Sequence, residues 1–306
     1  MGKIAFVFSG QGAQYSGMGK SLYELGGSAK KLYDEAEKLR PGTMNQSFSG
    51  TDEELKDTSN TQPCLYLVDL AAALSLGDRG IYADGAAGFS LGEVAALAYA
   101  NAYSHADGFS LVTKRGRFMA EAAGEADTAM CAVLKLDKDT VVNAAAEFEK
   151  LYAVNFNCPG QIVVSGLKSS IDKFAAHIKT LGGRCIPLAV SAAFHSPFMD
   201  AASDKLGAEM EGFSFSAPTI PVYTNLTAQP CKENISENLK MQMKSPVRWQ
   251  ETIENMIADG FTDFVEVGAG KTLCGLIKKI SGEVEVYSVE DAETLEETVR
   301  RLKENA

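Results

Sequence analysis

A serine flanked by glycines stands at residue 90, in the stretch AAGFSLGEVAAL. Gly88, Ser90 and Gly92 form the pattern G-x-S-x-G, in which the serine occupies a sharp turn between a strand and a helix and exposes its oxygen as a nucleophile. Ser90 and Glu93 also form the pattern S-x-x-E of a helix capping box, in which the hydroxyl turns back onto the helix. The small residues before Ser90 and the apolar run after it favour the nucleophile. The two patterns are compatible if Glu93 reaches back to the helix start and stiffens the turn from behind.

A serine nucleophile needs a general base, and the chain contains three histidines. His177 falls on the solvated side of a helix whose apolar stripe includes Phe174 and Ile178. His105 falls at a helix start, where a surface position is expected. His195, in SAAFHSPFM, stands among small and aromatic residues and is the remaining candidate for the base, with a buried structural histidine as the alternative.

Arg115 lies at the centre of the apolar face of a helix expected over residues 107–122, whereas Arg117 falls on the opposite face. Leaving a buried charge without a partner costs about 3–5 kcal/mol, so an anionic group is expected to meet Arg115. That group is either a structural Asp or Glu or a ligand carboxylate, which a planar guanidinium binds through two parallel hydrogen bonds.

The N-terminal stretch FVFSGQGAQ resembles a dinucleotide-binding loop, but Tyr15 stands where G-x-G-x-x-G requires its last glycine. Gln11 lies between two glycines directly after an apolar run. In that position its backbone N–H can lie beside a reacting carbonyl group.

Apolar runs rich in Val, Ile and Phe alternate with helical stretches, which is typical of an α/β protein with a mostly parallel sheet. Core strands are expected over residues 4–8, 84–89, 221–225, 264–267 and 284–289, and the helix after Ser90 is expected in the middle of the fold. Residues 127–189 follow the order β-α-β-β-α-β of a ferredoxin-like unit. We therefore predict a discontinuous large domain, 1–126 and 190–306, with an inserted small subdomain, 127–189.

The 306 residues include 29 Lys and Arg against 40 Asp and Glu, a formal charge of -11 that disfavours nucleic acid and anionic membrane surfaces as partners. Six dispersed cysteines indicate neither a zinc site nor a disulfide framework. No stretch approaches the roughly 20 apolar residues that span a bilayer. These features predict a cytoplasmic protein.

Seven motifs occur in the order and spacing of the malonyl-CoA:acyl carrier protein transacylases, which this chain resembles over essentially its whole length. They are FSGQGAQ, GFSLGE, KRGRFM, NFNCPGQ, AFHSPFM, SPVRW and VEVGAGKTL. The resemblance implies an α/β-hydrolase-like large domain with a ferredoxin-like insert. It also implies transfer of a malonyl group from malonyl-CoA to the phosphopantetheine thiol of acyl carrier protein, with ping-pong kinetics and without a metal or other cofactor.

The resemblance assigns roles to individual residues. Ser90 matches the acylated nucleophile and His195 its general base, which a main-chain carbonyl, matched by Arg248, holds in place. The backbone N–H groups of Gln11 and Leu91 match the oxyanion hole.

Further positions match the acyl pocket of the family. Arg115 matches the residue that binds the free malonyl carboxylate. Gln62, Phe194 and Asn157 match pocket residues, and in related polyketide acyltransferases an aromatic residue at the position of Phe194 accompanies malonyl over methylmalonyl.

The resemblance leads to two further expectations and leaves alternatives open. Since CoA and carrier proteins are acidic, a basic patch is expected at the pocket mouth, with Lys244, Lys271, Lys278, Lys279 and Arg184 as candidates. A monomer is expected from the habit of the family. The alternatives are a polyketide-type acyltransferase, a serine thioesterase or esterase with water as acceptor, and a carrier-binding domain without activity.

Overall fold

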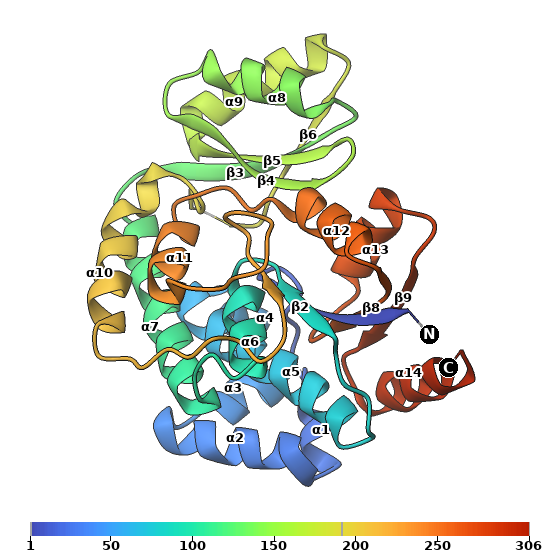
Figure 1. The fold of residues 1–306 in the computed structure, drawn as a ribbon. Helices are drawn as coiled ribbons and strands as arrows, with labels where there is room; N and C mark the ends of the chain where they lie inside the picture. Colours follow the sequence, from blue (N-terminus) through green and yellow to red (C-terminus); the bar gives the residue numbers. More distant parts are fainter. Residues whose placement is uncertain (1, 191, 306) are drawn as a thin grey trace.

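The large sheet is parallel and carries the strands expected from the sequence. The structure is a computed structural model that describes residues 2–190 and 192–305 (Figure 1). The sheet order is β7 (Val222–Tyr223), β2 (Gly85–Gly88), β1 (Lys3–Phe8), β8 (Phe261–Val267) and β9 (Glu285–Val289), and every neighbouring pair is parallel. The prediction of an α/β fold with a parallel sheet is confirmed.

Helices cover both faces of this sheet because alternate side chains of a strand point in opposite directions. Phe6 and Phe8 of β1 pack against one layer of helices, and Ala5 and Val7 pack against the other. The first layer contains α5 (Thr58–Gly77), α6 (Leu91–Tyr99), α7 (His105–Ala123) and α14 (Ala292–Glu304). The second contains α12 (Trp249–Ala258) and α13 (Thr272–Ile280). The sheet is therefore the middle of three layers.

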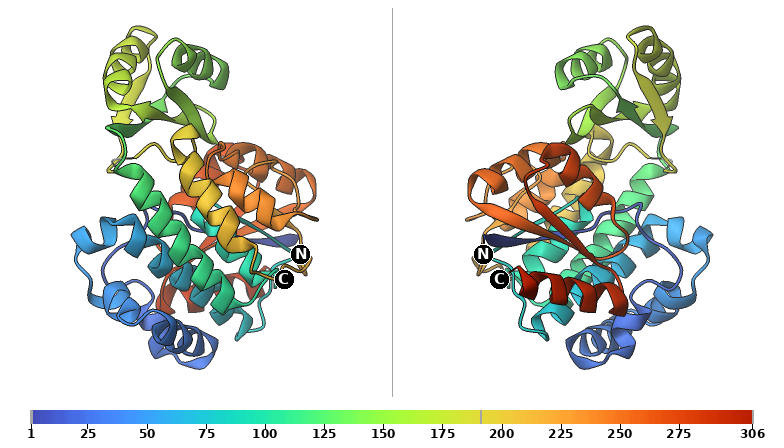
Figure 2. Two further views of the ribbon diagram at one scale, coloured as in Figure 1. Left: turned by 90° about the vertical axis from the view of Figure 1, so that its left-hand side faces the viewer. Right: turned by 90° about the vertical axis from the view of Figure 1, so that its right-hand side faces the viewer.

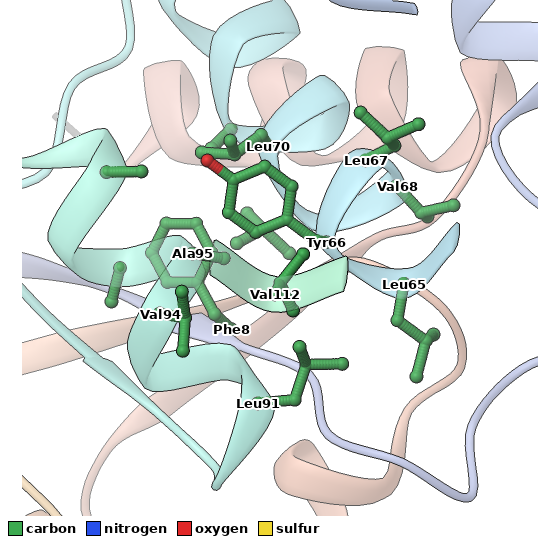
Figure 3. Close-up of a cluster of buried hydrophobic side chains, with 14 of the residues drawn as sticks. Phe8, Leu65, Tyr66, Leu67, Val68, Leu70, Leu91, Val94, Ala95 and Val112 are labelled. Carbon is green, nitrogen blue, oxygen red and sulfur yellow. The ribbon is translucent and has the colours of Figure 1, made fainter. Parts of the chain in front are cut away.

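The helix that follows Ser90 is the most enclosed part of the first layer. Every residue of α6 from Leu91 to Ala98 is buried, as its all-round apolar sequence predicts. Figure 3 shows Leu91, Val94 and Ala95 of this helix beside Phe8 of β1 and Tyr66 of α5. This packing fixes the helix that carries the turn at Ser90.

The small unit is an antiparallel sheet covered on one side by two helices. Its elements are β3 (Thr128–Leu134), α8 (Lys138–Ala146), β4 (Leu151–Cys158), β5 (Gln161–Leu167), α9 (Lys168–Thr180) and β6 (Arg184–Pro187). The sheet order is β4-β5-β3-β6 and the pairs are antiparallel, as a ferredoxin-like unit requires. Figure 2 shows this unit projecting from the larger body. The domain limits 1–126, 127–189 and 190–306 remain predictions.

The remaining helices lie around the large sheet. They are α1 (Lys20–Glu24), α2 (Gly27–Leu39), α3 (Thr43–Ser49), α4 (Asp52–Lys56), a 3-10 turn (Pro197–Met199), α10 (Asp200–Met210) and α11 (Ile235–Gln242). In Figure 1, α1 and α2 lie at the end of the molecule opposite the small unit. Among the helices formed by residues 2–190 and 192–305, none is long and apolar enough to cross a membrane.

Candidate active site

Ser90 occupies a strained turn between β2 and α6. Its backbone angles are φ 53° and ψ -103°, in a region that residues with a side chain rarely adopt. A Cβ atom on Gly88 would lie 1.9 Å from the carbonyl carbon of Gly92, and one on Gly92 would lie 2.2 Å from the carbonyl oxygen of Phe8. Only glycine fits at these two positions, so the G-x-S-x-G pattern does form the sharp turn expected of it.

The Ser90 side chain is not a helix cap. It makes no capping hydrogen bond, and its Oγ lies 2.7 Å from Nε2 of His195. The expected capping box is wrong, because the Ser90 N–H that Glu93 would have to meet donates instead to Oδ1 of Asn225 at 2.7 Å. Glu93 does lie behind the turn, where its Oε2 accepts the backbone N–H of Asn225 at 2.7 Å.

His195 is buried and held in one orientation. Its Nδ1 lies 3.0 Å from the carbonyl oxygen of Gln242 and 3.2 Å from that of Ser245. Two carbonyl acceptors require the proton on Nδ1, which leaves Nε2 free to accept a proton from Ser90. Burial, assisted by the charge of Arg115, lowers the pKa of His195 to about 4. The imidazole is therefore neutral at pH 7, as a general base must be.

The carbonyl that orients His195 was expected at Arg248, and that expectation is wrong. Arg248 precedes α12, so its carbonyl oxygen accepts the N–H and the hydroxyl of Thr252, both at 2.9 Å. The carbonyls of Gln242 and Ser245 lie at and just beyond the end of α11, where helix carbonyls lack a partner within the helix.

The other two histidines lie away from Ser90, as the sequence predicted. His105 begins α7, and His177 lies on α9 against the ring of Phe148 at 5.9 Å between centroids. His105 is half-buried rather than exposed, and this burial lowers its pKa.

Arg115 is buried at 1% exposure and points at Oγ of Ser90. Its Nη2 donates to Oγ of Ser90 at 3.2 Å and to Oε1 of Gln242 at 3.0 Å, and its Nη1 donates to Oε1 of Gln62 at 2.9 Å. All three acceptors are neutral, and no carboxylate of the described residues forms an ion pair with this guanidinium. Its Nε has no partner among them. Burial lowers the pKa of Arg115 to about 10, so the group stays charged at pH 7.

The main-chain amides of Gln11 and Leu91 are available to a ligand. Neither N–H donates a hydrogen bond to any acceptor in the described part of the chain. Leu91 is the first residue of α6, where an N–H has no partner within the helix. The side chain of Gln11 is anchored on Oγ1 of Thr58 at 3.0 Å.

A pocket of about 90 Å³ has a lining that includes Gln11, Gln62, Ser90, Leu91, Phe194 and His195. Arg115 is not part of this lining but donates to two of its members, Gln62 and Ser90. A neighbouring cavity of about 220 Å³ shares Gln11, Phe89, Asn155 and Leu188 with this pocket and is also lined by Asn157. The structure thus places Asn157 in the adjoining cavity rather than beside Ser90. A larger groove of about 750 Å³ lies between α8 and α12 and includes Arg248, but it contains none of the residues around Ser90.

Two residues that connect the site were missed from the sequence. Asn225 bridges the turn, since its Oδ1 accepts from Ser90 and its Nδ2 donates to the carbonyl of Gly88 at 2.7 Å. Gln242 contacts Arg115 through its side chain and His195 through its carbonyl. The position of Asn225 at the end of an expected core strand was a usable signal, because side chains at strand ends face the site. Nothing in the sequence near Gln242 indicates its role.

No three His, Cys, Asp or Glu side chains gather into a possible metal site within the residues that the structure describes. The six cysteines are free, and three of them are buried.

Comparison with known proteins gives a consistent answer. A family model described as "Acyl transferase domain" matches residues 5–301. The malonyl CoA-acyl carrier protein transacylase of Bacillus subtilis (strain 168) is 41% identical, over 99% of this chain and 98% of that protein. The protein of the same name from Synechocystis sp. is 36% identical, over 94% of this chain and 97% of its own.

Solved structures point to the same family as the sequence relatives. The malonyl CoA-acyl carrier protein transacylase of Clostridium perfringens has a TM-score of 0.95 and 36% identity, with 99% of this chain and 98% of that chain covered. A malonyl-transacylase solved in complex with its type II PKS acyl-carrier protein has a TM-score of 0.94 and 32% identity, with 98% and 99% covered. The chain therefore belongs to the acyl transferase family, among the malonyl-CoA:acyl carrier protein transacylases.

Proposed function

We propose that Ser90 carries the malonyl group from malonyl-CoA to the phosphopantetheine thiol of acyl carrier protein. This proposal rests on the position of the side-chain oxygen of Ser90. Oγ of Ser90 lies 2.7 Å from Nε2 of a neutral histidine and 3.2 Å from Nη2 of a buried arginine. A base and a carboxylate-binding group thus converge on one nucleophile.

The first half-reaction acylates Ser90. His195 Nε2 takes the hydroxyl proton as Oγ attacks the thioester carbonyl, and the N–H groups of Gln11 and Leu91 stabilise the oxyanion that forms. When the carbon–sulfur bond breaks, His195 returns the proton to the CoA sulfur. The product is a malonyl ester on Ser90 and free CoA.

The second half-reaction reverses these roles. His195 takes the proton of the phosphopantetheine thiol, the sulfur attacks the ester carbonyl, and the proton passes to Oγ of Ser90 as the ester bond breaks. The protein is then unchanged, and the kinetics are ping-pong. Proton transfer and acyl transfer account for every step, so we propose that the reaction needs no metal or organic cofactor.

Arg115 favours a malonyl transferase over an esterase for neutral acyl groups. A buried guanidinium with neutral partners suits a substrate that brings its own carboxylate, which a neutral ester lacks. Gln62 holds the opposite side of the guanidinium, and Phe194 narrows the pocket, which favours malonyl over methylmalonyl. The cytoplasmic location and the monomeric state remain predictions.

Mass spectrometry of the intact protein tests the proposal. After incubation with malonyl-CoA, we expect an increase of one malonyl group that is absent in Ser90→Ala and disappears when the holo carrier protein is added. Absence of the increase, or rapid release of free malonate without the carrier protein, would contradict the proposal and favour a hydrolase.

A further inference from the structure

Arg115 is a fully buried cation whose hydrogen-bond acceptors are all neutral oxygens. An uncompensated charge in this position is strongly unfavourable, so a negative charge is expected nearby. The carboxylate of Glu93, on the first turn of α6, has the largest charge effect on Arg115. Glu93 is itself at 0% exposure.

Glu93 accepts three hydrogen bonds and has no cation among their donors. Its Oε2 accepts from the backbone N–H of Asn225 at 2.7 Å and from Nε2 of Gln242 at 3.2 Å, and its Oε1 accepts from Nδ2 of Asn238 at 2.6 Å. Burial raises its pKa to about 7, while these three donors and Arg115 lower it. The carboxylate and the guanidinium therefore form two halves of a separated ion pair.

The side-chain amide of Gln242 lies between the two charges. Its Nε2 donates to Glu93, and its Oε1 accepts from Nη2 of Arg115 at 3.0 Å. The positive end of the amide dipole thus faces the carboxylate and the negative end faces the guanidinium, so the amide is stabilised by both charges. The same Nε2 lies 2.8 Å from the carbonyl oxygen of Ser90, which ties this arrangement to the turn that carries the nucleophile.

Other ionisable groups around the pair are neutral at pH 7. Burial raises the pKa of Tyr103 far above its usual value and that of Cys231 to about 11. The pKa of His195 is about 4. Within the described residues, the charges of this buried cluster are thus Arg115 and the carboxylate of Glu93, which is about half ionised at pH 7.

We infer that Glu93 is the positioning residue and counter-charge of Arg115, acting through the Gln242 amide. This inference rests on the proposed role of Arg115 as the malonyl carboxylate site. A direct ion pair would occupy the guanidinium, whereas the bridged pair balances its charge and leaves Nε without a partner. The second negative charge also weakens binding of the malonyl carboxylate, so the malonyl group is not held too tightly to be transferred.

Glu93→Gln tests the inference, because it removes the charge and preserves the size of the side chain. The variants are made in a protein that also carries Ser90→Ala, which cannot transfer the acyl group. Calorimetry can then measure Kd for malonyl-CoA and for acetyl-CoA. We expect Glu93→Gln to lower the Kd for malonyl-CoA about three- to tenfold and to leave the Kd for acetyl-CoA unchanged. The ratio of the acetyl-CoA Kd to the malonyl-CoA Kd therefore rises. Structural damage would instead raise the Kd values for both ligands together.

Glu237→Gln is the matched control, since Glu237 is exposed on α11, next to Asn238, and its neutralisation changes the net charge equally. We expect this control to leave both Kd values unchanged. The inference would be overturned if the ratio of the acetyl-CoA Kd to the malonyl-CoA Kd were no higher in Glu93→Gln than in this control.

Asn238→Ala provides a second route if Glu93→Gln does not fold. Loss of the Asn238 donor raises the pKa of Glu93 further, so the carboxylate is neutral in a larger share of molecules at pH 7. The ratio is expected to rise, by less than in Glu93→Gln, and an unchanged ratio in a folded variant would overturn the inference. Failure of the proposed function looks different, because the Ser90→Ala protein with Glu93 intact would then bind malonyl-CoA and acetyl-CoA equally well.

Discussion

The side-chain oxygen of Asn225 accepts the main-chain N–H of Ser90 at 2.7 Å. The amide nitrogen of the same side chain donates to the carbonyl of Gly88 at 2.7 Å, so one asparagine spans the turn on both sides of Phe89. Ser90 has a backbone φ of 53°, which is unfavourable for a residue with a side chain. The two hydrogen bonds stabilise this conformation and keep Oγ directed at His195.

Asn225→Ala should therefore damage both the fold and the reaction. It removes the partner of the part-buried Ser90 N–H and that of the buried Gly88 carbonyl, and loss of the buried hydrogen bond alone costs about 1–3 kcal/mol. We expect urea denaturation to show a lower midpoint and rapid-mixing experiments to show slower acylation by malonyl-CoA. Asn143→Ala, at an exposed position on α8, is the control. Unchanged acylation in Asn225→Ala would show that the turn holds without this side chain.

The pH dependence of acylation should report His195. Since the pKa of this histidine is lowered to about 4, the base stays neutral from pH 8 down to about pH 5 and becomes protonated below that. The rate of Ser90 acylation by acetyl-CoA, which has no carboxylate to titrate, should be flat over this range and fall as pH approaches 4. A midpoint near 6.5, the ordinary value for histidine, would contradict the burial argument.

His195→Ala complements the pH profile. Loss of the general base should slow acylation about 100- to 10,000-fold, with little change in Kd for malonyl-CoA, because His195 acts on the proton rather than on the ligand. Isothermal titration and single-turnover mass spectrometry measure the two quantities separately. A large loss of affinity with normal turnover would give His195 a binding role instead.

Arg115→Ala should lower malonyl transfer and spare acetyl transfer. Hydrogen bonds to a charged group contribute about 1.5–3 kcal/mol, so kcat/KM for malonyl-CoA should fall roughly 10- to 100-fold. Arg117→Ala is the matched control, because that side chain is on the opposite face of α7 and is 59% exposed. Equal losses with both substrates would mean that Arg115 has a structural role.

Carrier-protein binding should depend on salt through lysines near the cavity. Lys271 precedes α13, and Lys278 and Lys279 lie in its last turn; all three are exposed. Leu273 and Leu276 of the same helix line the adjoining cavity. Lys244, also a candidate, is already paired with Asp200 at 3.1 Å, so it is a weaker one. Lys271→Glu, which reverses the charge, should slow association with the carrier protein several-fold at low salt.

Lys303→Glu on α14 is the control for this reversal, because α14 lies on the large body away from the small unit (Figure 1). Stopped-flow association over a range of salt concentrations measures the effect. If neither salt nor the Lys271 reversal changed the association rate, the basic patch would lie elsewhere or be absent.

The sequence alone determined the features that depend on local pattern. The strands of both sheets and the order of the small unit followed from hydrophobic periodicity, which reflects burial along a single element. Ser90 was identifiable because its two glycines are imposed by close backbone contacts within and beside its own turn. Arg115 was identifiable because a charge on an apolar helix face contradicts that pattern, and His195 because only three histidines compete.

The tertiary structure decided the partners that are distant in the chain. Every residue has a main-chain carbonyl, so no residue type indicates that Gln242, rather than Arg248, holds His195. The hydrogen bond that Glu93 would have formed with Ser90 was taken by Asn225, which is 135 positions away from Ser90. The sequence determined which side chains can react, because reactivity and burial depend on residue type. The structure decided which groups hold and balance them, because hydrogen bonds and charges act through space.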